Sequence, residues 1–222
     1  MKSDKSNLTV HYADGRDTDA LYKLWKECFH DTDAFMAYYF DYYLRDNRIL
    51  ILAQENQLKS MIHLNPYTLS VCEKKVNSLY VVGVATDADF RHRGAMTRLL
   101  QRTFSDCYAG RIPLVYLMPA NEAIYTPFQF AYIYSQYVEK KTHTPFSSIH
   151  NVDAAIVRDI SAHPVSVEAE RQQLADWSNS LLSRHYDVFT WRDAYYFERL
   201  QMENQADGGD LLLLSANGKQ IG

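Results

Sequence analysis

The spacing of hydrophobic and polar residues in the first part of the chain predicts alternating strands and helices. Residues 8–12 predict a short strand, and residues 18–29 predict an amphipathic helix with one apolar face. Aromatic residues recur at helical spacing between positions 35 and 43, which predicts a second helix whose aromatic face forms core or a pocket wall. Residues 48–54 and 58–71 then predict two strands joined into a hairpin by a polar turn.

A strand, a helix and a further strand follow. Residues 78–86 are apolar without alternation, as in a central strand covered on both faces, and Gly83 predicts a bulge or a close approach by a ligand. Apolar residues from 96 to 108 recur at helical spacing, and Gly110 is a common helix stop. Together with a strand at residues 114–118, these elements form a βαβ unit. Two further elements are expected, a short helix or turn at residues 120–128 and a strand at residues 132–138.

The later part of the chain repeats the pattern of the earlier part. Residues 210–222 resemble residues 48–60, and each segment follows a predicted helix that contains Tyr-Tyr-Phe. The repeat predicts two domains, residues 1–145 and residues 146–222, of which the second is incomplete. The alternative is a chance similarity between two amphipathic segments.

The end of the sequence predicts a hairpin with little room for its second strand. Asn217-Gly218 is a strong signal for a two-residue hairpin turn, and four residues remain after it. We expect residues 210–215 to form an edge strand, and an exposed edge promotes self-association into a homo-oligomer.

The composition is that of a folded globular protein. The chain has 222 residues, 47% of them hydrophobic, and no apolar run approaches the roughly 18 residues that a membrane span needs. No signal-peptide pattern opens the sequence, so we expect a cytoplasmic protein with no membrane partner. The net charge of −4 disfavours nucleic acid as a partner.

The cysteines and histidines give no metal signature. Cys28, Cys72 and Cys107 are widely spaced and odd in number, which favours buried, reduced thiols over disulfides. The eight histidines show no spacing typical of a zinc site, so no metal is expected.

Basic residues gather just before the predicted helix that spans residues 96–108. Arg91, His92 and Arg93 precede Gly94 at that point. A helix N-terminus carries unpaired backbone N–H groups and a partial positive charge, so basic side chains are disfavoured there. We therefore expect a bound anion, with Gly94 allowing it to approach the backbone as in a phosphate-binding turn. The alternative is a solvated basic turn with Asp89 as an ordinary N-cap.

This segment resembles a motif of the GNAT superfamily of N-acetyltransferases, in which Arg/Gln-x-x-Gly-x-Gly/Ala holds the pyrophosphate of coenzyme A. The motif here reads Arg91-His92-Arg93-Gly94-Ala95-Met96, with Met96 at the position of the last glycine or alanine. That methionine and residues 119–128 are similar to the enhanced intracellular survival (Eis-like) branch. A second family feature is a tyrosine five positions before a phenylalanine. Tyr125 and Phe130 match it, with Gln129 in place of the usual glycine.

The resemblance implies the GNAT fold, an α/β (α+β) architecture with a mixed central sheet flanked by helices, followed here by an incomplete second GNAT-like domain. It implies acetyl-CoA as the cofactor and the primary amine of a small molecule or peptide as the acceptor. The amine attacks the thioester carbonyl, an oxyanion develops and the thiolate leaves, which calls for a base, an oxyanion donor and an acid.

The resemblance also assigns residues to these roles. The backbone of Val84, Ala85 and Thr86 would line the pantetheine and offer N–H groups to the carbonyl oxygen, and Tyr125 would protonate the leaving sulfur. The pyrophosphate would be bound by N–H groups of Arg91, His92, Arg93, Gly94, Ala95 and Met96.

Three questions stay open at this stage. A non-catalytic protein that binds acyl-CoA as a regulatory or structural ligand would have the same phosphate-binding turn. Eis-like enzymes are thought to use their own terminal carboxylate as the base, and that group is not expected in this chain. Trp25, Asp31 and Asp33, with the nearby tyrosines, either wall a pocket for a cationic amine or belong to the fold.

Overall fold

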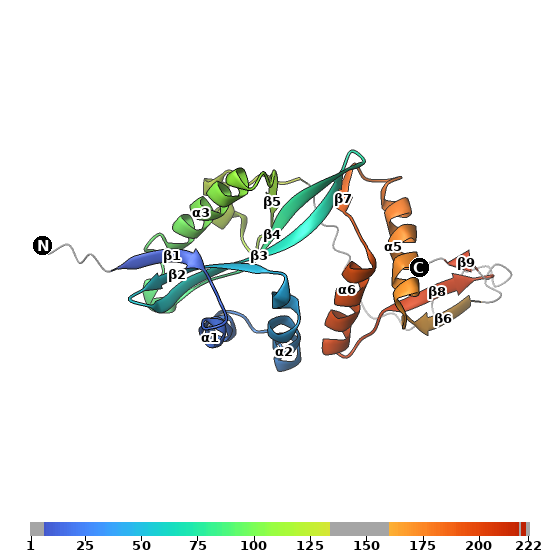
Figure 1. Cartoon of the computed structure of the whole chain (residues 1–222), viewed down its shortest axis with the longest axis horizontal. Helices are drawn as coiled ribbons and strands as arrows, with labels where there is room; N and C mark the ends of the chain where they lie inside the picture. The colour runs from blue at the N-terminus through green and yellow to red at the C-terminus, as the bar shows by residue number, and fades with distance from the viewer. Residues whose placement is uncertain (1–6, 134–159, 218, 221–222) are drawn as a thin grey trace, which may run out of the picture.

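The computed structural model describes residues 7–133, 160–217 and 219–220 and has the predicted α/β architecture. A mixed central sheet has helices on both faces (Figure 1). Its order is β1-β2-β3-β4-β5, with β7 beside β3. All neighbouring strands are antiparallel except β4 and β5, which are parallel. The strands are β1 (Leu8–Tyr12), β2 (Arg48–Gln54), β3 (Gln57–Val71), β4 (Lys74–Thr86), β5 (Leu114–Tyr116) and β7 (Val188–Thr190).

The predicted hairpin between β2 and β3 is confirmed. Its two turn residues, Glu55 and Asn56, have φ angles of 50° and 65°. Two consecutive left-handed residues give a turn whose twist matches that of the flanking strands.

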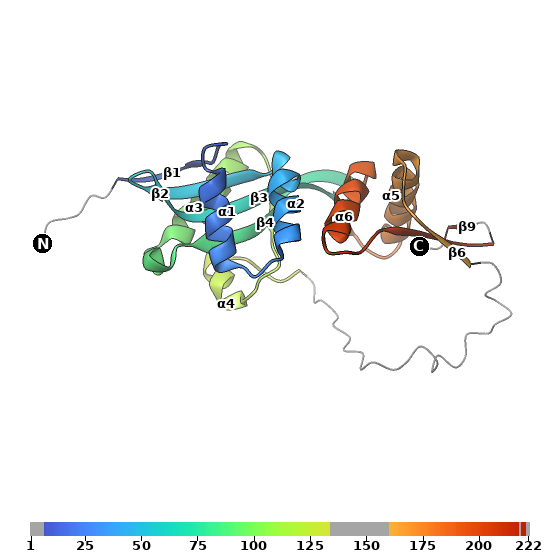
Figure 2. The ribbon, with the colours of Figure 1, turned by 90° about the horizontal axis from the view of Figure 1, so that it is seen from below.

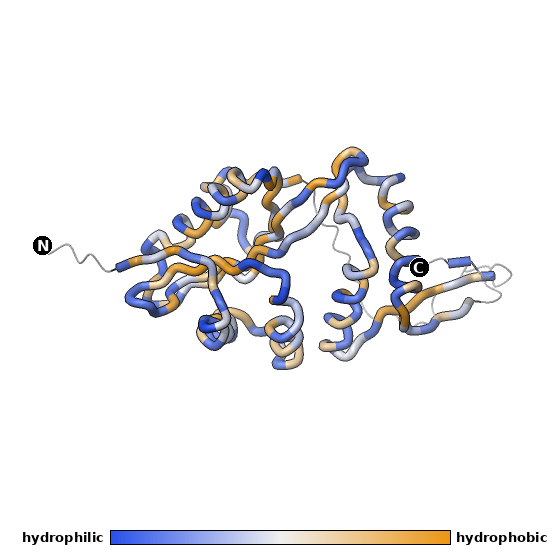
Figure 3. Tube along the Cα trace, viewed as in Figure 1, coloured by the Kyte–Doolittle hydropathy of each residue, from blue (hydrophilic) through white to orange (hydrophobic). Residues whose placement is uncertain are grey.

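Helices cover the two faces of the sheet. Helices α1 (Thr18–Cys28) and α2 (Asp33–Asp41) lie on one face, and α3 (Ala95–Ala109) lies on the other (Figures 1 and 2). Strand β2 serves both faces, because successive side chains of a strand point to opposite sides. Ile51 belongs to the core under α1 and α2, whereas Leu50 and Leu52 belong to the core under α3. Figure 3 shows hydrophobic residues concentrated along these central strands.

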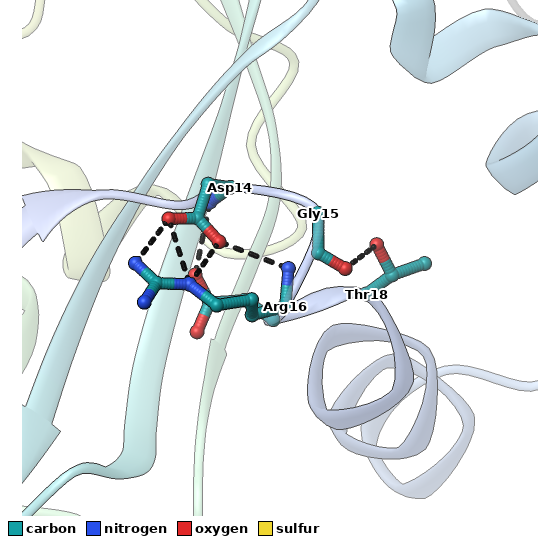
Figure 4. Close-up of polar contacts among 5 residues, drawn as sticks. Asp14, Gly15, Arg16 and Thr18 are labelled. Atoms are coloured by element: carbon teal, nitrogen blue, oxygen red, sulfur yellow. Dashed lines mark hydrogen bonds and ion pairs between the residues drawn. The ribbon is translucent and has the colours of Figure 1, made fainter.

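The turn that leads from β1 into α1 is held by its own polar groups (Figure 4). The Arg16 guanidinium donates to the Asp14 carboxylate, with Nη2 2.7 Å from Oδ2. The Thr18 hydroxyl donates to the carbonyl oxygen of Gly15 over 3.2 Å. Both charged side chains are largely exposed, so this pair orders the turn and adds little to global stability.

The aromatic residues of α2 and of the 3₁₀ turn η1 (Tyr43–Arg45) form core, as one of the two interpretations predicted. Tyr38, Tyr39 and Tyr43 are buried beneath the sheet. Tyr39 stacks on Tyr43 at 5.1 Å between ring centroids and lies 4.6 Å from the ring of Trp25.

The predicted bulge at Gly83 is confirmed, and its cause is a side chain of the chain itself. The register changes between Met61 and His63, where β4 contains one extra residue between Val82 and Ala85. Gly83 has a φ of +58°, and a Cβ placed on it would lie 2.3 Å from Cζ3 of Trp25. The residue that approaches this glycine is therefore an α1 tryptophan.

The predicted short helix or turn at residues 120–128 is confirmed, with slightly narrower bounds. A single helical turn, α4 (Glu122–Tyr125), continues into the 3₁₀ turn η3 (Thr126–Phe128). Tyr132 and Ile133 are not part of a strand, and the rest of the expected strand at 132–138 lies outside the described residues.

The second part of the chain has a small sheet of its own. Its elements are β6 (Ile160–Pro164), α5 (Glu168–Leu182), α6 (Ala194–Ala206), β8 (Leu212–Ala216) and β9 (Lys219–Gln220). These elements follow the same order as β1, α1, α2, β2 and β3 of the first part. The antiparallel pair β6–β8 corresponds to the antiparallel pair β1–β2. The expected domain boundary near residue 145 lies outside the described residues. The two-residue hairpin connection after Ala216 is confirmed by the pairing of Ala216 with Lys219.

Two expectations about exposed groups are wrong in part. Residues 210–215 were expected to form an edge strand, whereas β8 lies between β6 and β9. Strand β9 pairs only with Ser215 and Ala216, so residues 212–214 have no strand on that side among the described residues. All three cysteines are free, yet Cys72 is exposed rather than buried. Cys72 sits at φ +46° in the tight turn between β3 and β4, where its side chain cannot reach a core.

The two parts of the chain touch along β3 and α2. Strand β7, which lies between α5 and α6 in sequence, pairs with Leu69–Val71 of β3 and so extends the first sheet. Helix α6 lies beside α2 in both ribbon views (Figures 1 and 2), and the Tyr38 hydroxyl donates to the carbonyl oxygen of Arg199 over 2.8 Å.

Candidate functional site

The predicted phosphate-binding turn connects the central strand β4 to α3. It passes through the 3₁₀ turn η2 (Ala88–Phe90) and ends at Gly94, which is the N-cap of α3 with a φ of +74°. No side chain caps α3, and its first turn holds no acidic residue. Asp89, the alternative N-cap, lies within η2 instead. The backbone N–H groups at the start of α3 therefore have no side-chain acceptor.

Gly94 leaves the approach to this helix end open. A Cβ placed on Gly94 would meet no heavy atom within 4 Å, so the protein itself does not fill the space above it. Arg91, His92, Arg93 and Gly94 are all exposed. The turn is thus an accessible surface that fits an anion, and both its glycine and its uncapped helix are consistent with a pyrophosphate.

The basic side chains around the turn differ in how they are engaged. Arg91 donates from Nε to the carbonyl oxygen of Thr86 over 3.3 Å, and Arg93 lies over the ring of Phe90 at 5.3 Å. Arg102 is different, because it pairs with Asp106 one helical turn later at 2.9 Å. Arg91 and Arg93 are therefore the arginines best placed for an anion at the turn.

Strand β4 loses its parallel neighbour before it reaches the turn. Strand β5 pairs only with Ser78, Leu79 and Tyr80, whereas β4 continues to Thr86. The predicted pantetheine residues Val84, Ala85 and Thr86 lie in this later part of β4. Among the described residues, no strand pairs with them on the β5 side. In the part of the chain that the structure describes, β4 beyond Tyr80 therefore has one side without a neighbouring strand.

The structure joins all nine predicted cofactor residues in one strand, turn and helix start. Val84 and Met96 pack in the same core cluster as the residues that anchor α3. Ala85 and Ala95 are buried, so they fix the two ends of the turn. The remaining five residues, Thr86 and 91–94, lie between those anchors.

Tyr125 is the last residue of α4 and is half-buried. Its ring meets Phe130 edge-on at 5.8 Å, and Phe130 lies 5.9 Å from Phe104 of α3. Burial raises the pKa of the Tyr125 hydroxyl, so the group keeps its proton at neutral pH. Gln129, which replaces a family glycine, adopts the left-handed conformation that a glycine would favour, with φ +64°. The turn is therefore retained despite the substitution.

Trp25, Asp31 and Asp33 were named as a pocket wall or as part of the fold, and their contacts favour the fold. Trp25 is buried, and its Nε1 donates to Asp31 over 2.8 Å. Asp33 pairs with Lys26 at 2.8 Å, and this contact lowers the pKa of the carboxyl group. The contacts described for Trp25, Asp31 and Asp33 are thus contacts within the fold itself.

Sequence reasoning missed most of the residues that line a cleft between the two parts of the chain; of these, only Tyr43 was among the tyrosines named as a possible pocket wall. Tyr43, Tyr67, Tyr195 and Arg199 come together there from β3, η1 and α6. The only local signal was that Tyr195 and Arg199 are four residues apart on a predicted helix, which places them on one face. Their partners are more than 120 positions away, so no local pattern could identify the site.

The part of the chain that the structure describes has neither a metal-binding cluster nor a membrane-spanning helix. No group of three or more histidine, cysteine or acidic side chains gathers there as a metal site would require. None of the helices in those residues has the length and hydrophobicity to cross a bilayer.

Solved structures with a similar fold are acetyltransferases and related proteins. A protein from Enterococcus faecalis V583, described as a "Probable N-Acyltransferase", superposes on 97% of this chain with a TM-score of 0.70 and 13% identity. A GCN5-related N-acetyltransferase from Kribbella flavida covers 96% of the chain with a TM-score of 0.68 and 11% identity. The chain spans 53% of each of these two proteins, about half their length. At such identities the likeness concerns the fold alone.

A shorter protein is similar in structure over part of the chain. The ribosomal-protein-alanine N-acetyltransferase of Brucella melitensis biovar Abortus 2308 covers 61% of this chain and 99% of its own, with a TM-score of 0.51 and 13% identity. No curated protein matches the chain in sequence.

The sequence itself matches a family model. Residues 9–133, more than half of the chain, match the model described as "Acetyltransferase (GNAT) domain". That stretch contains the β4–α3 turn, the free end of β4 and Tyr125. The chain therefore belongs to the GNAT acetyltransferases, a family of enzymes that use acetyl-CoA.

Proposed function

We propose that the chain transfers the acetyl group of acetyl-CoA to a primary amine of a small molecule or peptide, by direct attack of the amine. The observation that carries this proposal is the uncapped start of α3 at Gly94, with open space above the glycine. We place the chain in the Eis-like branch of the family because Met96 and residues 119–128 are similar to that branch. We also propose that the protein is cytoplasmic.

The pyrophosphate of the cofactor would bind at residues 91–96. Unpaired N–H groups and the positive end of the helix dipole favour an anion there. Gly94 lets a phosphate oxygen approach the backbone, and the exposed Arg91 and Arg93 add positive charge. No carboxylate of the first helical turn competes for the same N–H groups.

The thioester would lie along the free side of β4. Backbone N–H groups of Val84, Ala85 and Thr86 would stabilise the negative charge that develops on the carbonyl oxygen. Tyr125 would donate its proton to the leaving sulfur, a role that its raised pKa allows. The acetyl-CoA itself supplies the activated acyl group.

A second proposal concerns the organisation of the chain. We propose that residues 1–145 form the acetyltransferase domain and that residues 146–222 begin a second GNAT-like domain. The repeated order of elements supports this division, as does the superposition of nearly the whole chain on half of two longer proteins.

The cofactor site is tested by calorimetric titration of acetyl-CoA into the Gly94→Asp variant. The new carboxylate would face the pyrophosphate, and unit charges about 5 Å apart repel by roughly 1–3 kcal/mol near a protein surface. We expect the affinity to fall at least about tenfold and the stabilisation by ligand to disappear. Gly208→Asp is the matched control, because Gly208 also has a positive φ, +81°, and open space around it.

Unchanged acetyl-CoA binding by Gly94→Asp would refute the site. The non-catalytic alternative, an acyl-CoA-binding domain, is separated by release of free coenzyme A in the presence of amines. Wild-type chain that binds acetyl-CoA but releases no coenzyme A with any aminoglycoside, polyamine or peptide amine would favour that alternative.

A further inference from the structure

A cleft of about 530 Å³ lies where β3 meets α6. Figures 1 and 2 show α6 standing beside α2 near this part of the sheet. The residues that matter for its chemistry are Tyr43, Asp46, Tyr67, Asp193, Arg199 and Glu203. None of them belongs to the acetyl-CoA site proposed above.

Arg199 is a buried cation in this cleft wall. The residue is 8% exposed, and its guanidinium lies over the ring of Tyr43 at 3.7 Å. Its Nη2 has no hydrogen-bond partner, and Arg199 forms no ion pair with the residues that the structure describes. Burial raises the pKa of Glu203 and the nearby charge of Arg199 acts to lower it, but the two side chains form no direct ion pair. A buried charge without a direct partner is costly, so a bound anion would stabilise this arrangement.

Aromatic rings form the apolar part of the wall. The rings of Tyr67 and Tyr195 each lie 5.7 Å from the guanidinium of Arg199. The hydroxyls of Tyr43 and Tyr67 are hydrogen-bonded to each other over 2.7 Å, and burial raises the pKa of Tyr67, so the Tyr67 hydroxyl keeps its proton. Neutral rings around a cation suit the planar carboxylate and apolar body of a small molecule.

Carboxylates at the edge of the cleft provide the opposite charge. Asp46 accepts a hydrogen bond from the Tyr195 hydroxyl, and Asp193 accepts from the backbone N–H of Tyr196 over 2.7 Å. Each carboxylate keeps further lone pairs for another donor. Glu203 is half-buried, and burial raises its pKa, so it contributes less negative charge than the two aspartates.

We propose that this cleft binds a molecule that carries both a carboxylate and an ammonium group on an apolar body, the chemistry of an amino acid or short peptide. The carboxylate pairs with the guanidinium of Arg199, and the ammonium lies toward Asp46 and Asp193. An isolated anion would gain Arg199 but face the aspartates, whereas an isolated amine would leave Arg199 unpaired. Binding at the cleft does not depend on acetyl transfer.

Calorimetric titration with three matched probes tests the proposal. L-phenylalanine carries both charges, 3-phenylpropionate lacks the ammonium, and 2-phenylethylamine lacks the carboxylate. We expect saturable binding of L-phenylalanine and affinities at least about tenfold weaker for the other two, because each loses one charge-assisted contact. Equal binding of all three, or no saturable binding of L-phenylalanine, would overturn the proposal.

Variants then locate the binding. Arg199→Lys keeps the charge but loses the planar guanidinium, so we expect the affinity for L-phenylalanine to fall about tenfold. Arg199→Met loses both, so we expect the affinity to fall about a hundredfold. Arg45→Met is the matched control, since Arg45 is an exposed arginine that stacks on Tyr42 at 5.2 Å outside the cleft.

A second position keeps the test decisive if Arg199→Met fails to fold. Asp46 is exposed, so Asp46→Asn should not disturb the fold. We expect it to weaken L-phenylalanine and leave 3-phenylpropionate unchanged or tighter. Wild-type affinity in both Arg199→Lys and Asp46→Asn would show that the ligand binds elsewhere.

Discussion

Replacing Gly83 by alanine would test how the bulge in the central strand is built. The benzo ring of Trp25 occupies the space where a side chain would be, with Cζ3 at 2.3 Å and Cη2 at 3.0 Å from an added Cβ. On the other side, Cδ2 of His63 lies at 3.1 Å. Trp25 cannot yield easily, because it is 4% exposed and its indole N–H is bonded to Asp31 over 2.8 Å.

The expected cost has two parts. The backbone at Gly83 has a φ of +58°, and a left-handed conformation costs an alanine about 1–2 kcal/mol. Forcing a methyl group into a filled core costs about 1–3 kcal/mol. The sum, about 2–5 kcal/mol, is a large part of the 5–15 kcal/mol that typically stabilises a domain.

Urea denaturation followed by circular dichroism measures this change in the free energy of unfolding. Gly94→Ala is the matched control, because Gly94 has a similar φ of +74° but no atom near the added Cβ, so only the backbone part applies. We expect Gly83→Ala to cost about 1–3 kcal/mol more than Gly94→Ala. In a double-mutant cycle, Trp25→Phe should recover part of the loss, since phenylalanine lacks the ring that clashes. Equal destabilisation by the two alanines would refute the steric account.

Three further outcomes are expected. Tyr125→Phe keeps the ring and removes the proton, so turnover with a responsive amine should fall about a hundredfold while acetyl-CoA affinity stays constant; a near-normal rate would leave Tyr125 with a packing role. His63 is fully buried, and burial lowers its pKa to about 3, well below the ordinary value near 6.5. Its neutral form thus contributes stability that is complete above about pH 6.5 and is lost as the pH falls toward 3. The free energy of unfolding should drop by about 1 kcal/mol by pH 5.5 in the wild-type chain and by less in His63→Gln. Parallel curves of unfolding free energy against pH for the two proteins would contradict this. A chain ended at residue 150 loses β7 and α6, which cover β3 and α2, so light scattering should show more self-association than in the longer chain; a monodisperse short chain would mean that these contacts are dispensable.

Local patterns predicted much of the first sheet because each strand and helix has its own spacing of apolar residues. Strands β1 and β2 have the predicted bounds, and α3 was found from its apolar spacing and its glycine stop. The turn between β2 and β3 followed from residues whose backbone preferences suit tight turns. Each of these features can be recognised within a short window of the sequence, although the strands pair with partners as far apart as Leu8 and Gln54.

Long-range pairing explains what was missed. Strand β7 has three residues, too few for any period, and joins β3 about 120 positions away. The position of β8 inside its sheet depends on two residues of β9, which no alternation could reveal. The exposure of Cys72 depends on a two-residue turn, whereas the prediction rested on cysteine spacing alone.

The same contrast separates the two candidate binding sites. The nine predicted cofactor residues lie within thirteen consecutive positions, so a strand, a glycine and a helix start, together with the resemblance to a family motif, were enough to propose them. The cleft around Arg199 depends on packing between α6 and the first sheet, and an arginine on that helix gives no sign in the sequence that it is buried. A binding site built from distant segments forms only where those segments pack together, so ligand binding and packing stabilise each other. Ligand binding at the cleft should therefore stabilise the contact between β3 and α6, whereas acetyl-CoA at the turn should stabilise the first sheet alone.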